Sequence, residues 1–184
     1  MTFSLDLLQD MIITAGREEL LPRFARVERM RKVDGSVLTE ADLAVQERLA
    51  GQLQQHWPGT VFLGEEMTAA EQAGLLATEQ PVWCLDPLDG TSNFAAGIPY
   101  FCISLALLQQ GGVRLGIVYD PLRHECFAAS RERGALLNNK HLTIVESGLK
   151  LGQATALIDF KRLDRSLAVR LVSDIPYASQ RSFG

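Results

Sequence analysis

Two aspartates three residues apart, Asp86 and Asp89, are the residues of this chain best suited to chemistry. They follow a short apolar run, Val82 to Leu85, which predicts a buried strand that stops at Asp86. A helix-compatible run, Thr91 to Phe94, comes next, so the free N–H groups of its first turn would lie beside both acids. Aspartates repel anions whereas a helix N-terminus attracts them, and a divalent cation reconciles the two. The pattern predicts a metal-assisted phosphate site.

A second pair of acids, Glu65 and Glu66, is expected at the end of a neighbouring strand. The run Thr60 to Leu63 predicts that strand, and Gly64 separates it from the glutamates. About twenty residues then lead to the strand before Asp86, which is enough for one helix, expected from about Thr68 to Thr78, and a return. Adjacent glutamates are usually solvated surface, but a pair placed directly after a strand is a better ligand candidate.

A third acid, Asp42, lies in the first turn of a helix that Thr39 can cap and that we expect to run to about His56. Taken alone, Asp42 is most simply an acid favoured by the helix dipole, and only its neighbours in space could give it another role. The expected apolar members of this helix are Ala41, Leu43, Ala44, Leu49 and Leu53.

Other phosphate and metal motifs fit the Asp86 segment less well. A helix-loop-helix calcium loop needs acids at alternate positions, and Leu88 occupies the third position here. A Walker loop needs Gly-Lys-Ser/Thr, which is absent. The haloacid-dehalogenase-like phosphatases have Asp-x-Asp-Gly-Thr, whereas these aspartates are three apart and Pro87 follows the first. A purely structural role, in which Asp89 only caps the following helix, leaves Asp86 and the glutamate pair unexplained.

The remaining elements indicate a mixed α+β fold. An amphipathic helix is expected from about Ser4, weakened at Gly16 and interrupted at Pro22. Apolar runs separated by tight turns, at Gly111-Gly112 and Asn138-Asn139, predict consecutive antiparallel strands. We therefore expect an α/β layered sandwich with a largely antiparallel sheet flanked by helices. The strands after Phe94 are expected at Phe101 to Leu108, Val113 to Tyr119, Glu125 to Ala129 and Leu142 to Val145.

Two domains are expected, because turn residues cluster between Glu146 and Leu151. Residues 1–147 would form an N-terminal domain that binds metal and phosphate, and residues 148–184 would begin a C-terminal α/β domain. In the second domain we expect a strand over Ala154 to Ile158 and a helix over about Leu163 to Val172.

Composition narrows the class of protein. The 184 residues are 47% hydrophobic and carry a net charge of -4, which argues against a dedicated nucleic-acid binder. No apolar run is long enough to cross a bilayer, and the first ten residues lack the pattern of a secretory signal. The three cysteines, Cys84, Cys102 and Cys126, have apolar neighbours and no Cys-x-x-Cys spacing, which predicts reduced core cysteines in a cytoplasmic protein.

The segments described above resemble a known family. The runs Gly64-Glu65-Glu66 and Trp83-Cys-Leu-Asp-Pro-Leu-Asp-Gly-Thr-Ser-Asn-Phe94 are similar to the two N-terminal signatures of the inositol monophosphatase family, which are Mg²⁺-dependent, lithium-sensitive phosphatases. Upstream, Lys32 to Asp42 is similar to the family segment before its second helix. The resemblance runs from near the first helix to Gly184.

The resemblance assigns roles to individual residues. Glu65, Asp86 and the main-chain carbonyl of Leu88 would hold a first Mg²⁺, and Asp86 would bridge to a second ion that Asp89 also binds. A metal-activated water, oriented by Glu65 and by Thr91 with Asp42 behind it, would attack phosphorus. The substrate phosphate would meet Gly90, Thr91 and Ser92. The basic run from Arg23 to Lys32 is most simply a solvated face, and the alternative is that Lys32 guards the phosphate pocket. Glu66 would lie behind the ligands.

One departure from the family concerns a later Trp-Asp-x-Ala-Ala-Gly segment. The family uses it for a third aspartate on the second ion and for the substrate's alcohol part. The tryptophans here, Trp57 and Trp83, are followed by Pro58 and Cys84, so this segment is absent and the chain is expected to be C-terminally truncated. We therefore expect a weakened second metal site.

The predicted function is hydrolysis of a small phosphate monoester, with inositol 1-phosphate as the default substrate. The resemblance also implies a homodimer and no membrane association. The alternative is a catalytically weak or inactive homologue that serves as a binding module, for example with the transcription machinery, and its one favourable feature is the basic run from Arg23 to Lys32.

Overall fold

The computed structural model describes residues 2–27, 30–31, 37–64 and 67–181. Within these residues the chain divides into two compact units, Met1–Thr143 and Ile144–Gly184. The division falls four residues before the predicted domain boundary at residue 147, and the assignment of a function to each domain stays a prediction. Each unit is described by itself below.

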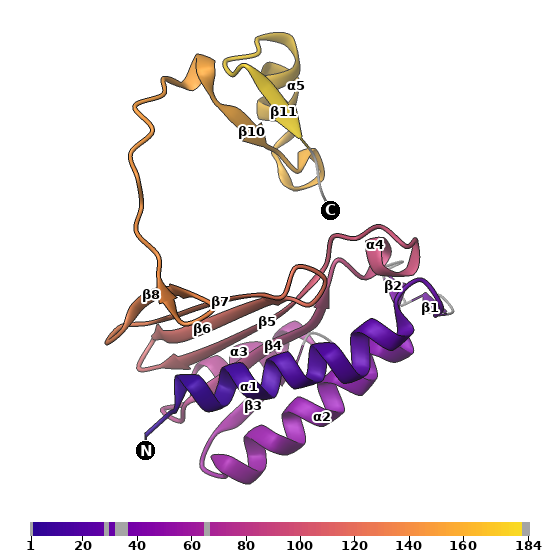
Figure 1. The fold of residues 1–184 in the computed structure, drawn as a ribbon, viewed down its shortest axis with the longest axis vertical. Coiled ribbons are helices and arrows are strands. Elements are labelled where there is room, and N and C mark those ends of the chain that lie inside the picture. Colours follow the sequence, from indigo (N-terminus) through magenta and orange to yellow (C-terminus); the bar gives the residue numbers. More distant parts are fainter. Residues whose placement is uncertain (1, 28–29, 32–36, 65–66, 182–184) are drawn as a thin grey trace. The chain divides into compact units, whose positions relative to one another are not determined.

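The first unit is built on a mixed sheet with the strand order β3-β4-β5-β6-β7-β8-β9 (Figure 1). β3 pairs with β4 in parallel, and every later pair in this sheet is antiparallel. The predicted mixed sheet with mostly antiparallel strands is therefore confirmed. The strands are β3 (Val61–Gly64), β4 (Val82–Asp89), β5 (Cys102–Gln109), β6 (Gly112–Asp120), β7 (Glu125–Ser130), β8 (Gly134–Leu137) and β9 (Lys140–His141).

Two details of the meander differ from the prediction. β8 was not predicted, because its four residues, Gly134–Leu137, give too short an apolar pattern. The strand expected over Leu142 to Val145 is wrong, since β9 ends at His141 and residues 142–150 form no regular element. The turn at Asn138-Asn139 is confirmed, and both asparagines have a positive φ, a conformation that asparagine tolerates well.

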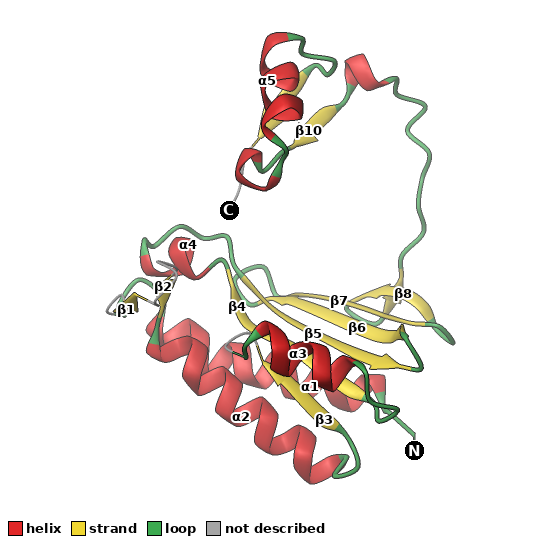
Figure 2. Cartoon of the chain, turned by 180° about the vertical axis from the view of Figure 1, so that it is seen from behind, coloured by secondary structure: helices red, strands yellow, loops and turns green. Residues whose placement is uncertain are grey.

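α1 (Leu5–Ala15) and α2 (Glu40–His56) lie side by side over one face of the sheet (Figure 2). Ser4 caps α1, and the chain continues through a π-helical turn, η1 (Gly16–Leu20), and a 3-10 turn, η2 (Leu21–Arg23). The predicted weak point at Gly16 is where the α-helix becomes a π-helix. Burial at three- and four-residue spacing explains why α1 forms: its buried residues are Leu5, Leu8, Gln9, Met11, Ile12 and Ala15.

α2 begins and ends as predicted. Thr39 caps it, and Asp42 closes a capping box with the backbone N–H of Thr39. The predicted apolar members of α2 include Leu43, which is 47% exposed, and leave out Val45, which is fully buried. The buried stripe of α2 comprises Ala41, Asp42, Val45, Leu49 and Leu53, so the carboxyl of Asp42 points toward the interior of the protein.

The described residues of the first unit also form four short elements. α3 (Ala69–Leu76) connects β3 to β4, and none of its residues is buried. α4 (Thr91–Ala95) follows β4 directly, and Phe94 is its buried residue. β1 (Met30–Arg31) and β2 (Val37–Leu38) pair in an antiparallel ribbon, and β2 contacts α4.

The second unit contains β10 (Thr155–Leu157), which pairs in parallel with β11 (Ser179–Arg181), and α5 (Arg165–Ser173) between them. Asp164 caps α5. The predicted strand and helix are thus confirmed, with slightly shorter bounds. Two 3-10 turns, η3 (Leu151–Gln153) and η4 (Phe160–Arg162), accompany them. None of the helices in the described residues is long and apolar enough to cross a membrane.

Gly16 lets the helical segment approach β6. A Cβ at this position would lie 2.7 Å from Cε1 and 2.9 Å from Cδ1 of Tyr119, whose ring is buried in the core. We therefore expect Gly16→Ala to lower the free energy of unfolding by about 1–3 kcal/mol, because the ring must move within a packed interior. Urea unfolding followed by tryptophan fluorescence measures this, since Trp57 and Trp83 both lie in the first unit.

Gly51→Ala is the matched control for this substitution. Gly51 lies inside α2, and a Cβ there would meet nothing within 4 Å. Alanine is the better helix former, so this variant should match the wild type or exceed it by up to about 1 kcal/mol. Equal losses in both variants would show that contact with Tyr119 is not the cause.

Candidate active site

β4 carries Asp86 and Asp89 within the strand, which corrects the prediction that the strand stops at Asp86. Asp86 pairs with Ser104 and Asp89 pairs with Cys102. Between these two pairs the chain advances three residues in β4 but only two in β5. The extra residue is a β-bulge, and Pro87 fits there because it has no N–H to give to the ladder. The backbone N–H of Leu88 donates to Oδ1 of Asp86 at 3.1 Å, which fixes that carboxylate beside the bulge.

β3 brings the chain to the same place. Its last residue, Gly64, is in register with Leu85, the residue directly before Asp86. Parallel neighbours end at the same edge of a sheet, so the chain leaves β3 at the edge where β4 bulges. The predicted ligand Glu65 and its neighbour Glu66, expected behind the ligands, follow Gly64 but lie outside the described residues, as does Lys32.

Gly90 makes the turn from β4 into α4. It has φ of +92°, and a Cβ there would lie 2.9 Å from the carbonyl oxygen of Tyr100 and 3.2 Å from Cα of Phe101. Both the conformation and the close approach require glycine. Phe94 then anchors α4 by an edge-on contact with Phe101, with ring centroids 4.8 Å apart, and Ser92 stays exposed in the first turn.

Thr91 joins this turn to α2. Its Oγ1 lies 2.9 Å from the carbonyl oxygen of Leu88 and 3.2 Å from Oδ1 of Asp42. A hydroxyl has one hydrogen, so it donates to one of these oxygens at a time and keeps its lone pairs for another donor. The family resemblance implies that Asp42 lies behind Thr91, and the structure brings the two side chains together from positions 49 residues apart.

Asp42 is held firmly in this position. Its Oδ2 accepts hydrogen bonds from the backbone N–H of Thr39 at 2.7 Å and from the Thr39 hydroxyl at 2.6 Å. Only 3% of Asp42 is exposed. Burial raises the pKa of this carboxyl above its ordinary value, and the hydrogen bonds from Thr39 and Thr91 offset part of that rise.

The prediction that all three cysteines are core residues holds for Cys126 alone, because Cys84 and Cys102 are only half-buried. The Sγ of Cys102 lies 3.9 Å from Oδ2 of Asp89. Burial, followed by the negative charges of Asp89, Asp86 and Asp120, raises the pKa of Cys102 to about 12. The thiol is therefore neutral and acts as a weak S–H donor to Asp89. Sequence patterns gave no signal for this contact, because it depends on the pairing of β4 with β5.

The negative charges near Cys102 also indicate whether a cation could bind beside Asp86 and Asp89. Three carboxylates act on one half-buried thiol, which shows that negative charge accumulates around Asp86 and Asp89. The carbonyl of Leu88 accepts from Thr91 and has a second lone pair. Hard oxygen donors of this kind suit Mg²⁺. Within the described residues, no group of three or more His, Cys, Asp and Glu side chains is placed to hold a metal ion.

Asp42 makes stability depend on pH. Its raised pKa means that, between the unfolded and folded values, the folded state binds more protons, so stability falls as pH rises through that window. Asp42→Asn stays neutral. We expect its free energy of unfolding, relative to wild type, to be higher at pH 7 than at pH 3.5 or below, measured by urea unfolding without divalent cations. A relative stability that is unchanged across this range would contradict the assignment.

The family sequence profile described as "Inositol monophosphatase family" matches residues 8–173. Among curated proteins, the chain is 40% identical over 108 residues to inositol monophosphatase 2 of Solanum lycopersicum, an alignment that covers 59% of this chain and 41% of the relative. It is 33% identical over 128 residues to the Nus factor SuhB of Xylella fastidiosa, covering 68% of this chain and 44% of the relative. The chain thus spans less than half the length of these relatives.

Solved structures show the same fold. An IMPase of Thermotoga maritima matches with a TM-score of 0.80 and 26% identity, covering 98% of this chain and 68% of that one. An IMPase/NADP phosphatase, solved in complex with Mg²⁺ and phosphate, matches with a TM-score of 0.78 and 23% identity, covering 97% of this chain and 67% of that one. With the profile match across most of the sequence, these findings show that the chain belongs to the inositol monophosphatase family.

Proposed function

We propose that this chain contributes the metal- and phosphate-binding part of a Mg²⁺-dependent phosphomonoester hydrolase, with inositol 1-phosphate as the default substrate. The observation that carries the proposal is that the Thr91 hydroxyl contacts both Asp42 and the carbonyl of Leu88, the residue directly before Asp89 in β4. Family membership supports the reaction class, and the name of the tomato relative supports the substrate. The Mg²⁺ and phosphate of the IMPase/NADP phosphatase complex support the choice of ion.

Asp86, Asp89 and the carbonyl oxygen of Leu88 would hold the ions, joined by Glu65 from the segment after β3. When bound, Mg²⁺ lowers the pKa of water and clamps phosphate oxygens. The β-bulge serves this arrangement, because it presents both aspartates and the carbonyl between them within one short stretch of β4. The described residues thus supply two of the three proposed carboxylates.

Thr91 and Asp42 would accept the proton of the attacking water. The Thr91 hydroxyl can donate its hydrogen to Oδ1 of Asp42 and accept one from water at the same time. Burial raises the pKa of Asp42, which brings a carboxylate closer to the range in which it works well as a base. Thr39 holds the other carboxylate oxygen, so Oδ1 keeps its direction toward Thr91.

The turn at Gly90 would receive the substrate phosphate. Gly90 has a positive φ and α4 begins at Thr91, so the backbone N–H groups of Gly90, Thr91 and Ser92 are the ones that would bind the anion. Lys32 would add a positive charge from the segment between β1 and β2. A homodimer and a cytoplasmic location are further parts of this proposal that follow from the family.

Replacing either aspartate tests the proposal. Asp89→Ala and Asp86→Asn should each lower the release of inorganic phosphate from inositol 1-phosphate by at least about a hundredfold in the presence of Mg²⁺, because each removes a metal ligand. Removal of Mg²⁺ with EDTA should have the same effect, reversed by adding Mg²⁺. Asp10→Asn, an exposed change on α1, is the control and should keep wild-type activity. Full activity of the Asp89 or Asp86 variant would overturn the assignment.

Li⁺ separates this family from the dehalogenase-like phosphatases. We expect phosphate release by this chain to fall as Li⁺ is added at constant ionic strength, with Na⁺ in the matched control. Equal rates in the two salts would argue against an inositol monophosphatase type of site.

A binding role with the transcription machinery is the second candidate, favoured by the similarity to a protein named Nus factor SuhB. In that case the chain would release no phosphate from a panel of sugar phosphates, nucleotides and inositol 1-phosphate. Binding to purified transcription complexes would then survive Asp89→Ala, because that interaction would not need the metal ligands. Loss of binding in this variant would count against a separate interaction surface.

A further inference from the structure

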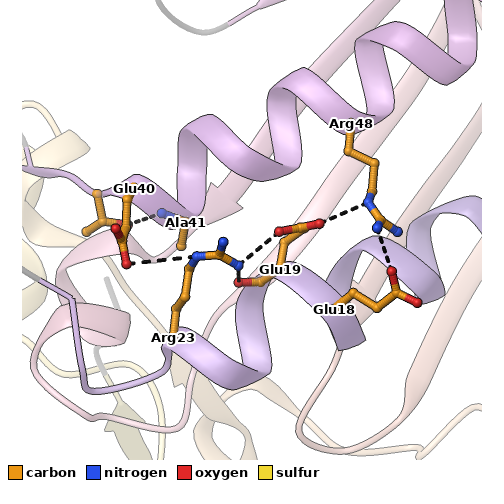
Figure 3. A network of polar contacts seen from close by, with 7 residues as sticks. Glu18, Glu19, Arg23, Glu40, Ala41 and Arg48 are labelled. Carbon is orange, nitrogen blue, oxygen red and sulfur yellow. Dashed lines mark hydrogen bonds and ion pairs between the residues drawn. The ribbon is translucent and has the colours of Figure 1, made fainter.

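A cluster of ion pairs ties the turns after α1 to α2 (Figure 3). At its centre, the carboxylate of Glu19 contacts two arginines: Oε2 lies 2.9 Å from Nη1 of Arg23, and Oε1 lies 3.0 Å from Nε of Arg48. Glu19 lies in the π-helical turn, Arg23 in the 3-10 turn and Arg48 on α2. One carboxylate therefore bridges two separate helical segments.

Further contacts extend the cluster along α2. Arg48 also pairs with Glu18 at 2.5 Å, and Nε of Arg23 lies 3.8 Å from the carboxylate of Glu40, the first residue of α2. From Glu40 to Arg48 the helix advances about 12 Å at 1.5 Å per residue. Asp42 lies within this stretch, so the cluster spans the part of α2 that carries the proposed proton acceptor.

The cluster is more than a set of surface pairs. The Glu19 side chain is 17% exposed, and those of Arg48 and Arg23 are 26% and 31% exposed. Partly buried ion pairs are screened less by water and salt than exposed ones. Nη1 of Arg23 also donates to the backbone carbonyl of Glu19 at 2.8 Å, which holds this arginine in place.

Directional contacts of this kind can define the axial position of a helix. The buried stripe of α2 is mainly aliphatic, and apolar burial is non-directional. The hydrogen bond from Thr91 to Asp42 is already 3.2 Å long, so a small shift of α2 away from α4 would take the two oxygens out of hydrogen-bonding range.

We propose that Glu19, Arg23 and Arg48 are positioning residues that hold the first turns of α2 so that the carboxylate of Asp42 meets the hydroxyl of Thr91. The π-helical turn belongs to this arrangement, because it presents Glu18 and Glu19 to α2 while Gly16 admits the ring of Tyr119. The expected effect on kcat rests on the proposed function, whereas the position of Asp42 relative to Thr91 can be tested without any activity.

Glu19→Gln is the direct test, because it keeps the size of the side chain and removes its charge. In the full chain labelled with ¹³C at threonine methyl groups, we expect the Thr91 methyl resonance to move, while that of Thr155 in the second unit serves as the reference. With Mg²⁺ and inositol 1-phosphate, kcat should fall about tenfold with little change in KM, because a displacement of about 1 Å can cost up to a hundredfold in rate.

Asp6→Asn is the matched control. Asp6 lies on α1 and forms an ion pair at 2.8 Å with Arg133, between β7 and β8, and no residue of α2 takes part in this pair. The variant should leave both the Thr91 resonance and kcat unchanged. Arg48→Lys keeps the charge but offers one donor group where arginine offers two to Glu18 and Glu19, so its effects should lie between wild type and Glu19→Gln. It also serves as the test variant if circular dichroism shows that Glu19→Gln is unfolded.

The outcomes separate the two proposals. A shifted Thr91 resonance with reduced kcat in Glu19→Gln, and neither in Asp6→Asn, supports positioning. A Thr91 resonance that stays in place in the folded variants overturns it, as does an equal loss of kcat in the Asp6 control. If wild type releases no phosphate but Glu19→Gln moves the Thr91 resonance, the positioning role stands and the hydrolase assignment fails.

In an Asp42→Asn background, Glu19→Gln should cause little further loss of kcat, because both changes act on the same contact.

Discussion

The hydrogen bond between Thr91 and Asp42 is the contact on which the arrangement of the site depends. It joins the first turn of α4 to the first turn of α2, and it forms only if both helices start at the right place. Thr39 fixes the start of α2 by capping it, and Gly90 fixes the start of α4 by adopting a positive φ. Leu88 lies in the bulge of β4, and its carbonyl also accepts a hydrogen bond from Thr91, which ties the bulge to the same contact.

Local chemistry explains what could be predicted from sequence. The cap at Thr39, the end of α2 and the glycine at position 90 each depend on a few neighbouring residues, and the structure confirms these elements. Local chemistry misleads at Asp86, because aspartate followed by proline is typical of the end of a strand, whereas β4 continues to Asp89. A β-bulge absorbs both residues, and whether a bulge forms is decided by the partner strand rather than by the segment itself.

Contacts between distant residues could not be derived from local patterns, and the contact of Thr91 with Asp42 was implied only by the family resemblance. The choice of Leu43 over Val45 for the buried face of α2 failed because both fit a helical period, and only packing against α1 and β4 decides between them. The place of Cys102 beside Asp89 follows from pairing between β4 and β5, which apolar periodicity does not encode. The roles of Glu65 and Lys32 remain predictions, since both lie outside the described residues.

Electrostatics at this site opposes stability. A buried carboxylate at Asp42 and the negative charge around Asp86 and Asp89 are costly in a folded protein, and surrounding hydrogen bonds offset only part of that cost. Acidic groups in such unfavourable environments are concentrated at binding and catalytic sites. The stability that α1, α2 and the sheet provide through apolar burial therefore allows the acids to remain where a cation would compensate them.

The one parallel pair in the seven-stranded sheet has a consequence for sequence variation. Pairing of β3 with β4 places Gly64 beside Leu85. The helix on that path, α3, contributes no buried residue, so its length and composition are weakly constrained by the interior. Insertions and substitutions in α3 should therefore be tolerated during evolution. The connection from β3 to β4 can acquire new contacts in this way without a change in the pairing of the two strands.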